Sequence, residues 1–308
     1  MKQIVVGEVA IPRSFERRYG EGVDRGLCLG GGGLFLIAWM ASYLQTLSED
    51  GLSFKMAERV IGTSAGSVVG TALTARRLGW VCTEMSLLTR LPRSITARAM
   101  AASPRPSQSR ALELMLAAVD AEPGTVRSIG HAALAAVTSS NSTQRTVGLL
   151  TGARTWPSPT LEITCVDAYT GQRCIVTSTS GVPLSAAIAA SCAVPGFAAP
   201  RQIGDRFCMD GGMAGTGVHL DRVAGARRAL VLSLSGAEGI SDGVATQALG
   251  SAQQELDDLA AAGTEVLHRS PEAVTFDQLM TPASVPDALA MGKRQAKRDH
   301  DLVASFWR

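Results

Sequence analysis

The sequence has little net charge and no long apolar run, and each of these two shortages excludes a class of protein. The formal net charge over the 308 residues is +2 at pH 7. So small a charge offers no basic surface for nucleic acid, and we expect no nucleic-acid partner. No uninterrupted apolar stretch reaches the roughly 18 residues that a membrane span needs. The amino-terminal residues also lack the apolar run of a signal peptide, so the sequence predicts a cytoplasmic protein.

Cysteine and histidine are scarce, and neither is arranged for metal binding. The six cysteines are Cys28, Cys82, Cys165, Cys174, Cys192 and Cys208. They form no C-x-x-C pair, so we expect neither a zinc site nor a disulfide framework, but reduced and buried thiols. The four histidines are His131, His219, His268 and His300. The sequence thus predicts no metal site.

Strand, glycine turn and helix follow one another twice in the first eighty residues. The apolar residues 26–31 lead through glycines into a helical pattern over residues 35–51, and residues 58–62 lead into a second helix over residues 65–79. This order is typical of a parallel α/β sheet. We predict one α/β domain over residues 1–308, with a mostly parallel central sheet flanked by helices on both faces.

The rest of the chain predicts a helical excursion and then a return to the sheet. Residues 80–150 show a helical pattern without a strand signal and are expected to form an excursion or cap. The apolar part from Trp80 to Leu91 is expected to pack in the core, with an acyl groove or transient contact with a membrane surface as alternatives. The later elements expected are hairpins over 161–178 and 201–212, a helix over 183–194, a central parallel strand over 228–236, a long helix over about 243–268, a short strand near Val274 and a terminal helix to Trp307.

A serine stands where the second strand meets its helix. Ser64 lies between Gly62 and Gly66 in the stretch GTSAG. This G-x-S-x-G spacing is typical of a nucleophile elbow, a strained turn that lifts the serine Oγ into a cleft at a helix N-terminus. The alternative is a plain turn in which Ser64 only caps the helix.

Two further glycine-rich stretches accompany this serine. Gly30 to Gly33 follow the first strand, where their amides can face an anion at a helix N-terminus. A dinucleotide-binding loop is the weaker interpretation, since Phe35 stands where its third glycine belongs. Asp210 precedes two glycines at the end of the second hairpin. The three sites form a coherent set: Ser64 as nucleophile, Asp210 as base, and the amides of Gly31, Gly32 and Gly33 as an oxyanion hole.

In their order and separation these three motifs resemble those of the patatin-like phospholipase family. The resemblance implies a three-layer α/β/α fold, a lipid or acyl-ester substrate, and a Ser64–Asp210 dyad that needs neither histidine nor cofactor. The stretch SCAVPGF, residues 191–197, also resembles the segment that precedes the family's aspartate. A Ser–Asp–His triad with His219 or His268 stays open by chain order. We expect both histidines to be surface or packing residues.

One position departs from the family's pattern. The family's glycine motif continues with Arg or Lys and then Gly, whereas this chain has Phe35 and Leu36 there. We expect these two side chains to contact substrate and to favour neutral esters over anionic phospholipids; the alternative is that Phe35 packs inward. Two other functions stay open, namely an acyltransferase or cyclase using the same dyad, and a lipid-binding protein without activity.

Overall fold

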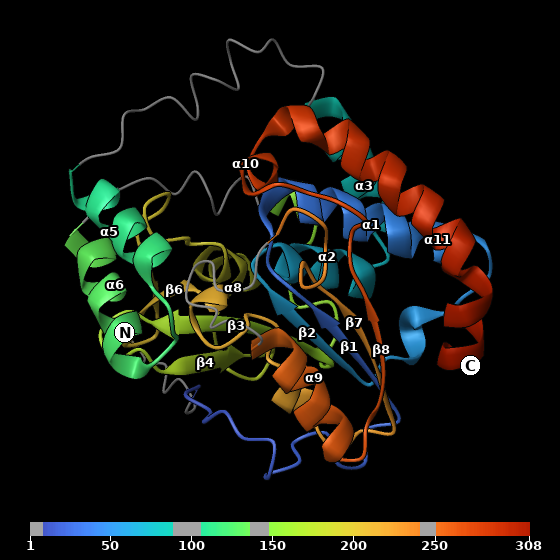
Figure 1. Cartoon of the computed structure of the whole chain (residues 1–308), viewed down its shortest axis with the longest axis horizontal. Helices are drawn as coiled ribbons and strands as arrows, with labels where there is room; N and C mark the ends of the chain where they lie inside the picture. Colours follow the sequence, from blue (N-terminus) through green and yellow to red (C-terminus); the bar gives the residue numbers. More distant parts are fainter. Residues whose placement is uncertain (1–8, 89–105, 136–147, 241–250) are drawn as a thin grey trace.

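A computed structural model describes residues 9–88, 106–135, 148–240 and 251–308. In this part of the chain an eight-stranded sheet runs through the centre of the molecule (Figure 1). Its strands are β1 (Arg25–Leu29), β2 (Arg59–Thr63), β3 (Leu161–Asp167), β4 (Arg173–Val176), β5 (Arg201–Ile203), β6 (Arg206–Asp210), β7 (Arg228–Leu232) and β8 (Glu265–Arg269). The order is β5-β6-β3-β2-β1-β7-β8, and β4 also pairs with β3.

The sheet is mostly parallel, as the sequence predicts. Strands β8, β7, β1, β2 and β3 are successive parallel neighbours, whereas β4, β5 and β6 add antiparallel pairs at one side. Both faces of the inner parallel strands β7, β1, β2 and β3 are buried, which explains their nearly continuous apolar sequences, whereas β8 at the edge is partly exposed. Along β1, for example, Leu27 and Leu29 belong to one core cluster and Cys28 to another.

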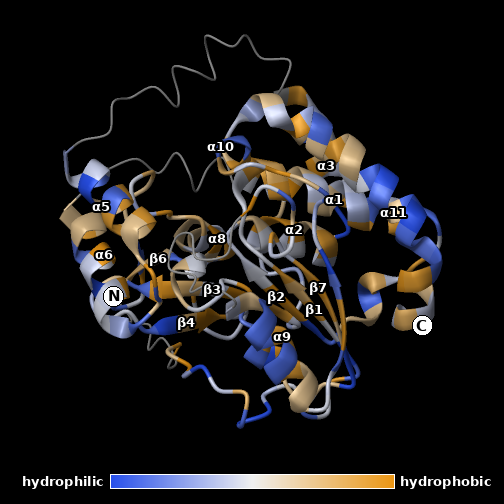
Figure 2. Ribbon diagram, viewed as in Figure 1, coloured by the Kyte–Doolittle hydropathy of each residue, from blue (hydrophilic) through white to orange (hydrophobic). Residues whose placement is uncertain are grey.

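Helices cover both faces and complete three layers. They are α1 (Gly33–Glu49), α2 (Ala65–Thr74), α3 (Leu78–Leu88), α5 (Pro106–Ala117), α6 (Pro123–Ala135), α8 (Leu184–Ser191), α9 (Ser251–Ala261), α10 (Phe276–Leu279) and α11 (Val285–Trp307). Helices α1, α2, α8 and α11 share the larger core cluster on one face of the sheet. Helix α9 and the 3-10 turn η3 (Leu220–Val223) pack on the other. Figure 2 shows β1 and β2 as largely hydrophobic and much of α9 and α11 as hydrophilic.

The long helix α11 is fixed to α1 by buried polar contacts. Trp39 Nε1 donates to Gln295 Oε1 at 2.7 Å, and the Tyr43 hydroxyl donates to Asp299 at 3.1 Å. A Cβ at Gly292 would lie 2.5 Å from the carbonyl oxygen of Trp39, so only glycine allows this close approach of the two helices. The sequence predicts the terminal helix to Trp307, and the structure confirms it.

The prediction that the helix over about 243–268 continues to residue 268 is wrong. Helix α9 ends at Ala261, and Glu265–Arg269 forms strand β8 instead, parallel to β7. Gly263, with φ +86°, ends the helix in a conformation that favours glycine. Pairing with β7 is a long-range interaction, which local periodicity does not reveal. Residues 241–250, also predicted as helix, lie outside the described residues.

The structure describes only part of the excursion predicted over residues 80–150. Helices α5 and α6 and most of α3, which begins at Leu78, lie in it, while residues 89–105 and 136–147 fall outside the described ranges. In α3, Val81 and Met85 are buried in the core, while Trp80 and Leu87 are exposed. All six cysteines are free; four are buried as predicted, whereas Cys82 and Cys192 are only partly buried. Among the described helices, none combines the length and the apolar character that crossing a membrane requires.

Candidate active site

Strand β3 brings together two residues that lie far apart in the sequence. Thr164 pairs with Thr63 of β2 and with Ile175 of β4, whereas the next residue, Cys165, pairs with Cys174 of β4 and with Asp210 of β6. Because a strand has only two edges, β4 borders one edge, and β2 and β6 follow each other along the other. The carboxyl-terminal ends of β2 and β6 therefore meet at this edge of β3. Ser64, directly after β2, and Asp210, the last residue of β6, come to the same place.

Ser64 occupies a strained turn. Its backbone has φ 51° and ψ −115°, a conformation that costs a non-glycine residue about 1–3 kcal/mol. A Cβ at Gly66 would lie 2.0 Å from the carbonyl oxygen of Leu29, and one at Gly62 would lie 2.7 Å from that of Gly66. Both glycines are thus required for α2 to begin against β1 and β2. Ser64 is 7% exposed at the start of α2.

The glycine loop lies directly against this turn. The Gly66 amide donates to the Gly30 carbonyl at 3.0 Å, and a Cβ on Gly31 would lie 3.3 Å from the Cβ of Ser64. Within the described part of the chain, the amides of Gly31, Gly32 and Gly33 donate no backbone hydrogen bond. Free amides beside a serine at a helix N-terminus can stabilise a negative oxygen.

Asp210 is buried with one oxygen occupied and one open. Its Oδ1 accepts from the Gly212 amide at 2.8 Å, and its backbone amide donates to Ala193 at 3.0 Å. Its Oδ2 is buried and makes no hydrogen bond of ordinary geometry with the described residues. Burial raises the pKa of Asp210 to about 6, against the lowering effects of the Ser64 hydroxyl and the Gly212 amide. Oδ2 is therefore the oxygen of this carboxylate that is free to accept a further hydrogen bond.

The last residue of α8 and the two residues that follow it contact both Ser64 and Asp210, and the sequence motifs gave them no such role. Ser191 Oγ accepts from the Ser64 amide at 2.8 Å, the Cys192 thiol donates to the Ser64 carbonyl at 3.4 Å, and the Ala193 carbonyl accepts from Asp210. Burial raises the pKa of Cys192 to about 12, so its sulfur stays a neutral donor and does not compete as a nucleophile. The resemblance of residues 191–197 to a family segment was the signal that could have indicated these contacts.

Ser64, Asp210 and the glycine loop all line one cavity of about 180 Å³. Its apolar lining includes Met115, Val194, Phe197, Val218, Leu234, Phe276, Leu279 and Met280. Asp210 carries the only charge among the described lining residues. Phe35 and Leu36 do not line this cavity. Their side chains are 1% and 0% exposed in the main core cluster, which is the inward packing that sequence analysis gave as the alternative for Phe35.

Neither histidine considered for a triad bonds to the serine or the aspartate. His219 is buried, and its Nε2 lies 3.0 Å from the Gly211 carbonyl, so it packs behind the Asp-Gly-Gly turn. His268 lies on β8, and its Nε2 is 2.8 Å from Ser233 Oγ. Burial lowers the pKa of His268 to about 4, so its ring is neutral at physiological pH. Among the described residues, no His, Cys, Asp and Glu cluster is suited to hold a metal ion.

The pKa of Asp210 predicts a pH dependence. If its carboxylate takes the serine proton, kcat/KM falls about tenfold for each pH unit below about 6, and is level just above. A pH profile measured with a neutral ester tests this expectation, because the substrate does not itself titrate. A profile that is level from pH 4 to 7, or that follows a group near pH 4, would contradict it.

The chain matches the family model described as patatin-like phospholipase over residues 27–220, more than half of its length. No curated protein matches it significantly. A solved structure of the type III effector protein ExoU is 16% identical, with a TM-score of 0.39. That alignment covers 91% of this chain and 53% of the other, so the chain spans about half the length of that protein.

Proposed function

The chain belongs to the patatin-like phospholipase family, and on this premise we propose that it is a serine acyl hydrolase with a Ser64–Asp210 dyad. Membership supports lipid hydrolase activity; the dyad, the acyl-enzyme and the class of ester are the proposal. The observation that carries this proposal is that the carboxyl-terminal ends of β2 and β6 meet along one edge of β3. It puts a strained serine, a buried carboxylate with an open oxygen and free glycine amides into one cavity.

The reaction has two halves. Ser64 Oγ attacks the acyl carbonyl carbon while its proton passes to Asp210 Oδ2, and the amides of Gly31 and Gly32 stabilise the oxyanion. The bond to the alcohol oxygen then breaks, and Asp210 returns the proton to that leaving group. Water attacks the acyl-enzyme, giving its proton to the same carboxylate. Cleavage of the Ser64 ester releases the acid and restores the dyad.

The cavity favours a neutral ester. An anionic headgroup would lie in a space whose only charged lining residue in the described chain is the Asp210 carboxylate, without a cation to offset the repulsion. Phe197 and Phe276 also line the cavity and are half-exposed, so an acyl chain can extend along them toward solvent. We therefore assign the preference for neutral esters to the residues that line the cavity. Phe35 and Leu36 are buried away from it and do not contribute.

We expect kcat/KM for a neutral ester, such as a monoacylglycerol, to exceed that for an anionic phospholipid of equal chain length by about tenfold or more. Phe276→Arg, which puts a cation at the cavity mouth, should shift the ratio toward the phospholipid by about two- to fivefold. Phe207→Arg is the matched control, because Phe207 is similarly exposed but packs against Tyr169, away from the cavity. A parent enzyme that prefers the phospholipid, or equal shifts in both variants, would contradict the assignment.

Product analysis tests the reaction type. With an ester substrate, the parent should release free acid, and Ser64→Ala should release it only at background rate. In the presence of an added alcohol, a hydrolase keeps free acid as the main product. Transfer of most of the acyl group to the alcohol would favour the acyltransferase alternative.

A further inference from the structure

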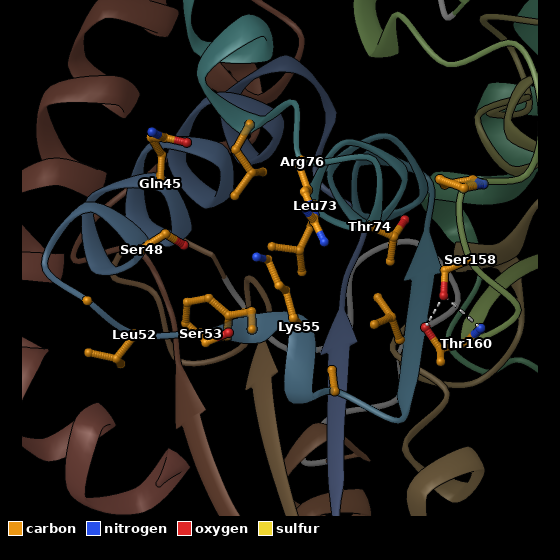
Figure 3. A pocket seen from close by; sticks show the side chains of 16 residues that line it. Gln45, Ser48, Leu52, Ser53, Lys55, Leu73, Thr74, Arg76, Ser158 and Thr160 are labelled. Atoms are coloured by element: carbon orange, nitrogen blue, oxygen red, sulfur yellow. Dashed lines mark hydrogen bonds between the residues drawn. The ribbon is translucent and has the colours of Figure 1, made fainter.

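A second cavity lies at the opposite end of the sheet from Ser64. It has a volume of about 560 Å³, larger than the cavity at the serine and within the range of roughly 300–1,000 Å³ typical of small-molecule sites (Figure 3). Its lining includes Ala57 before β2, Val60 near the start of β2, Thr160 before β3, and the last turns of α1 and α2. Ser64 instead follows the carboxyl end of β2, so the two cavities are separate.

Two cations reach into this cavity without a partner. Figure 3 shows the Lys55 and Arg76 side chains pointing into the same space. Within the described residues neither forms an ion pair or a side-chain hydrogen bond, and no carboxylate lines the cavity. The floor is apolar, with Leu52, Phe54 and Leu73. A cationic rim above an apolar floor suits a ligand that has both an anionic end and a hydrocarbon part.

Arg76 holds a backbone conformation that normally favours glycine. The Arg76 amide donates to Leu73, and the Arg77 amide to Ala72 at 2.7 Å, the pattern that closes a helix with a left-handed residue. That residue is Arg76, with φ 59°. Glycine would end α2 here without strain. An arginine at such a position, with its guanidinium directed into a cavity, supports a binding role.

The charges indicate a ligand with one negative charge. Helices α1 and α2 both end at this cavity, and each helix C-terminus carries roughly half a negative charge. Together with the Glu49 carboxylate in the last turn of α1, they offset part of the positive charge of Lys55 and Arg76. The net positive charge at the cavity is therefore small, which suits a singly charged carboxylate better than a doubly charged phosphate. The hydroxyls of Ser53, Thr74 and Ser158, which also line the cavity, can donate to its oxygens.

We propose that this cavity is a binding site for a monoanionic amphiphile, a hydrocarbon chain that ends in a carboxylate. The carboxylate lies between Lys55 and Arg76, and the chain lies on the apolar floor. The site is independent of the Ser64 cavity, and its occupation does not depend on the proposed hydrolase activity.

The test is calorimetric titration of the full chain carrying Ser64→Ala, so that binding is measured without turnover. The probes are decanoate, decanol and decyl phosphate, each below its aggregation concentration. We expect decanoate to bind at least tenfold more tightly than decanol, and more tightly than decyl phosphate at a pH where the phosphate is doubly charged. Lys55→Gln with Arg76→Gln should weaken decanoate binding about fivefold to tenfold, as expected for partly exposed cations. Lys297→Gln, on the exposed face of α11, is the control and should change nothing.

The variant Arg76→Gly separates a loss of ligand binding from a loss of stability. Glycine relieves the left-handed strain, so this variant should unfold at a temperature equal to or above that of the parent and yet bind decanoate more weakly. Equal affinity for decanoate and decanol, an unchanged affinity in Arg76→Gly, or absence of decanoate binding would overturn the proposal. Tighter binding of decyl phosphate would overturn the carboxylate assignment.

Discussion

Replacing Asp210 with asparagine should nearly abolish ester hydrolysis and at the same time make the protein more stable at neutral pH. An amide cannot take the proton from Ser64, so kcat should fall by about 10²–10⁴-fold, the usual range for losing a general base. Ser64→Ala should cost about 10⁴–10⁶-fold, because it removes the nucleophile itself. The double variant should be no less active than Ser64→Ala, since the two groups act in one step.

The gain in stability follows from the raised pKa of Asp210. Burial brings it from 3.8 to about 6, so the folded protein binds this proton more tightly than the unfolded chain. The free energy of unfolding therefore falls as pH rises from about 4 to about 6, by about 3 kcal/mol for a shift of roughly two units. Asparagine carries no charge to bury, and can keep the contact with the Gly212 amide. The gain in free energy of unfolding of Asp210→Asn over the parent should be absent below pH 4 and complete above about pH 6.

Denaturant unfolding at pH 4 and pH 7.5, with activity measured alongside, checks both effects. Asp205→Asn is the matched control, because Asp205 is exposed in the turn between β5 and β6. It should change neither quantity. An Asp210→Asn protein that is folded and active would exclude Asp210 as the base. If Asp210→Asn is less stable than the parent at pH 7.5, burial of the ionised Asp210 carboxylate does not destabilise the folded protein.

Gly66→Ala should damage folding and activity together. The added Cβ would lie 2.0 Å from the Leu29 carbonyl oxygen and 2.5 Å from its carbon, both backbone atoms that a rotamer change cannot move. Helix α2 must shift away from β1, at a cost of about 3 kcal/mol or more. The shift also disturbs the bond from the Gly66 amide to the Gly30 carbonyl, which joins the serine turn to the glycine loop.

Gly124→Ala is the control, since a Cβ at Gly124 would meet nothing within 4 Å. It lies in the first turn of α6, where alanine should be neutral or slightly stabilising. Both variants are compared by urea unfolding and by kcat/KM on a neutral ester. If Gly66→Ala is as stable and as active as Gly124→Ala, the close contact between α2 and β1 is not required.

The sequence predicts the parts of the fold that local patterns encode. Residues 25–79 alternate strand, glycine turn and helix, and the structure has β1, α1, β2 and α2 there. The strand β8 was missed because residues 265–269 are less apolar than β7 and become a strand by pairing with it. The inward packing of Phe35 depends on how α1 lies on the sheet, which its neighbours along the chain do not specify.

In the candidate site, too, local sequence patterns predict some features, whereas others depend on tertiary contacts. G-x-S-x-G, the glycine run and Asp-Gly-Gly each have a backbone requirement that appears in the sequence as glycine, so their residues could be named in advance. How Ser64 meets Asp210 could not, because it depends on β2 and β6 sharing one edge of β3. The contact of Ser191 with the Ser64 amide is a tertiary one across 127 positions, and no spacing rule contains it.

Covalent labelling by a fluorophosphonate, followed by peptide mass spectrometry, tests the central claim most directly. The reagent reacts with a serine whose hydroxyl is activated by a base and whose oxyanion is stabilised. We predict an adduct on Ser64 in the parent, much slower labelling in Asp210→Asn, and no adduct in Ser64→Ala. Absence of labelling in the folded parent would contradict the assignment of Ser64 as the nucleophile. An adduct on Ser233 or Ser235, two further serines that line the cavity, would contradict it as well.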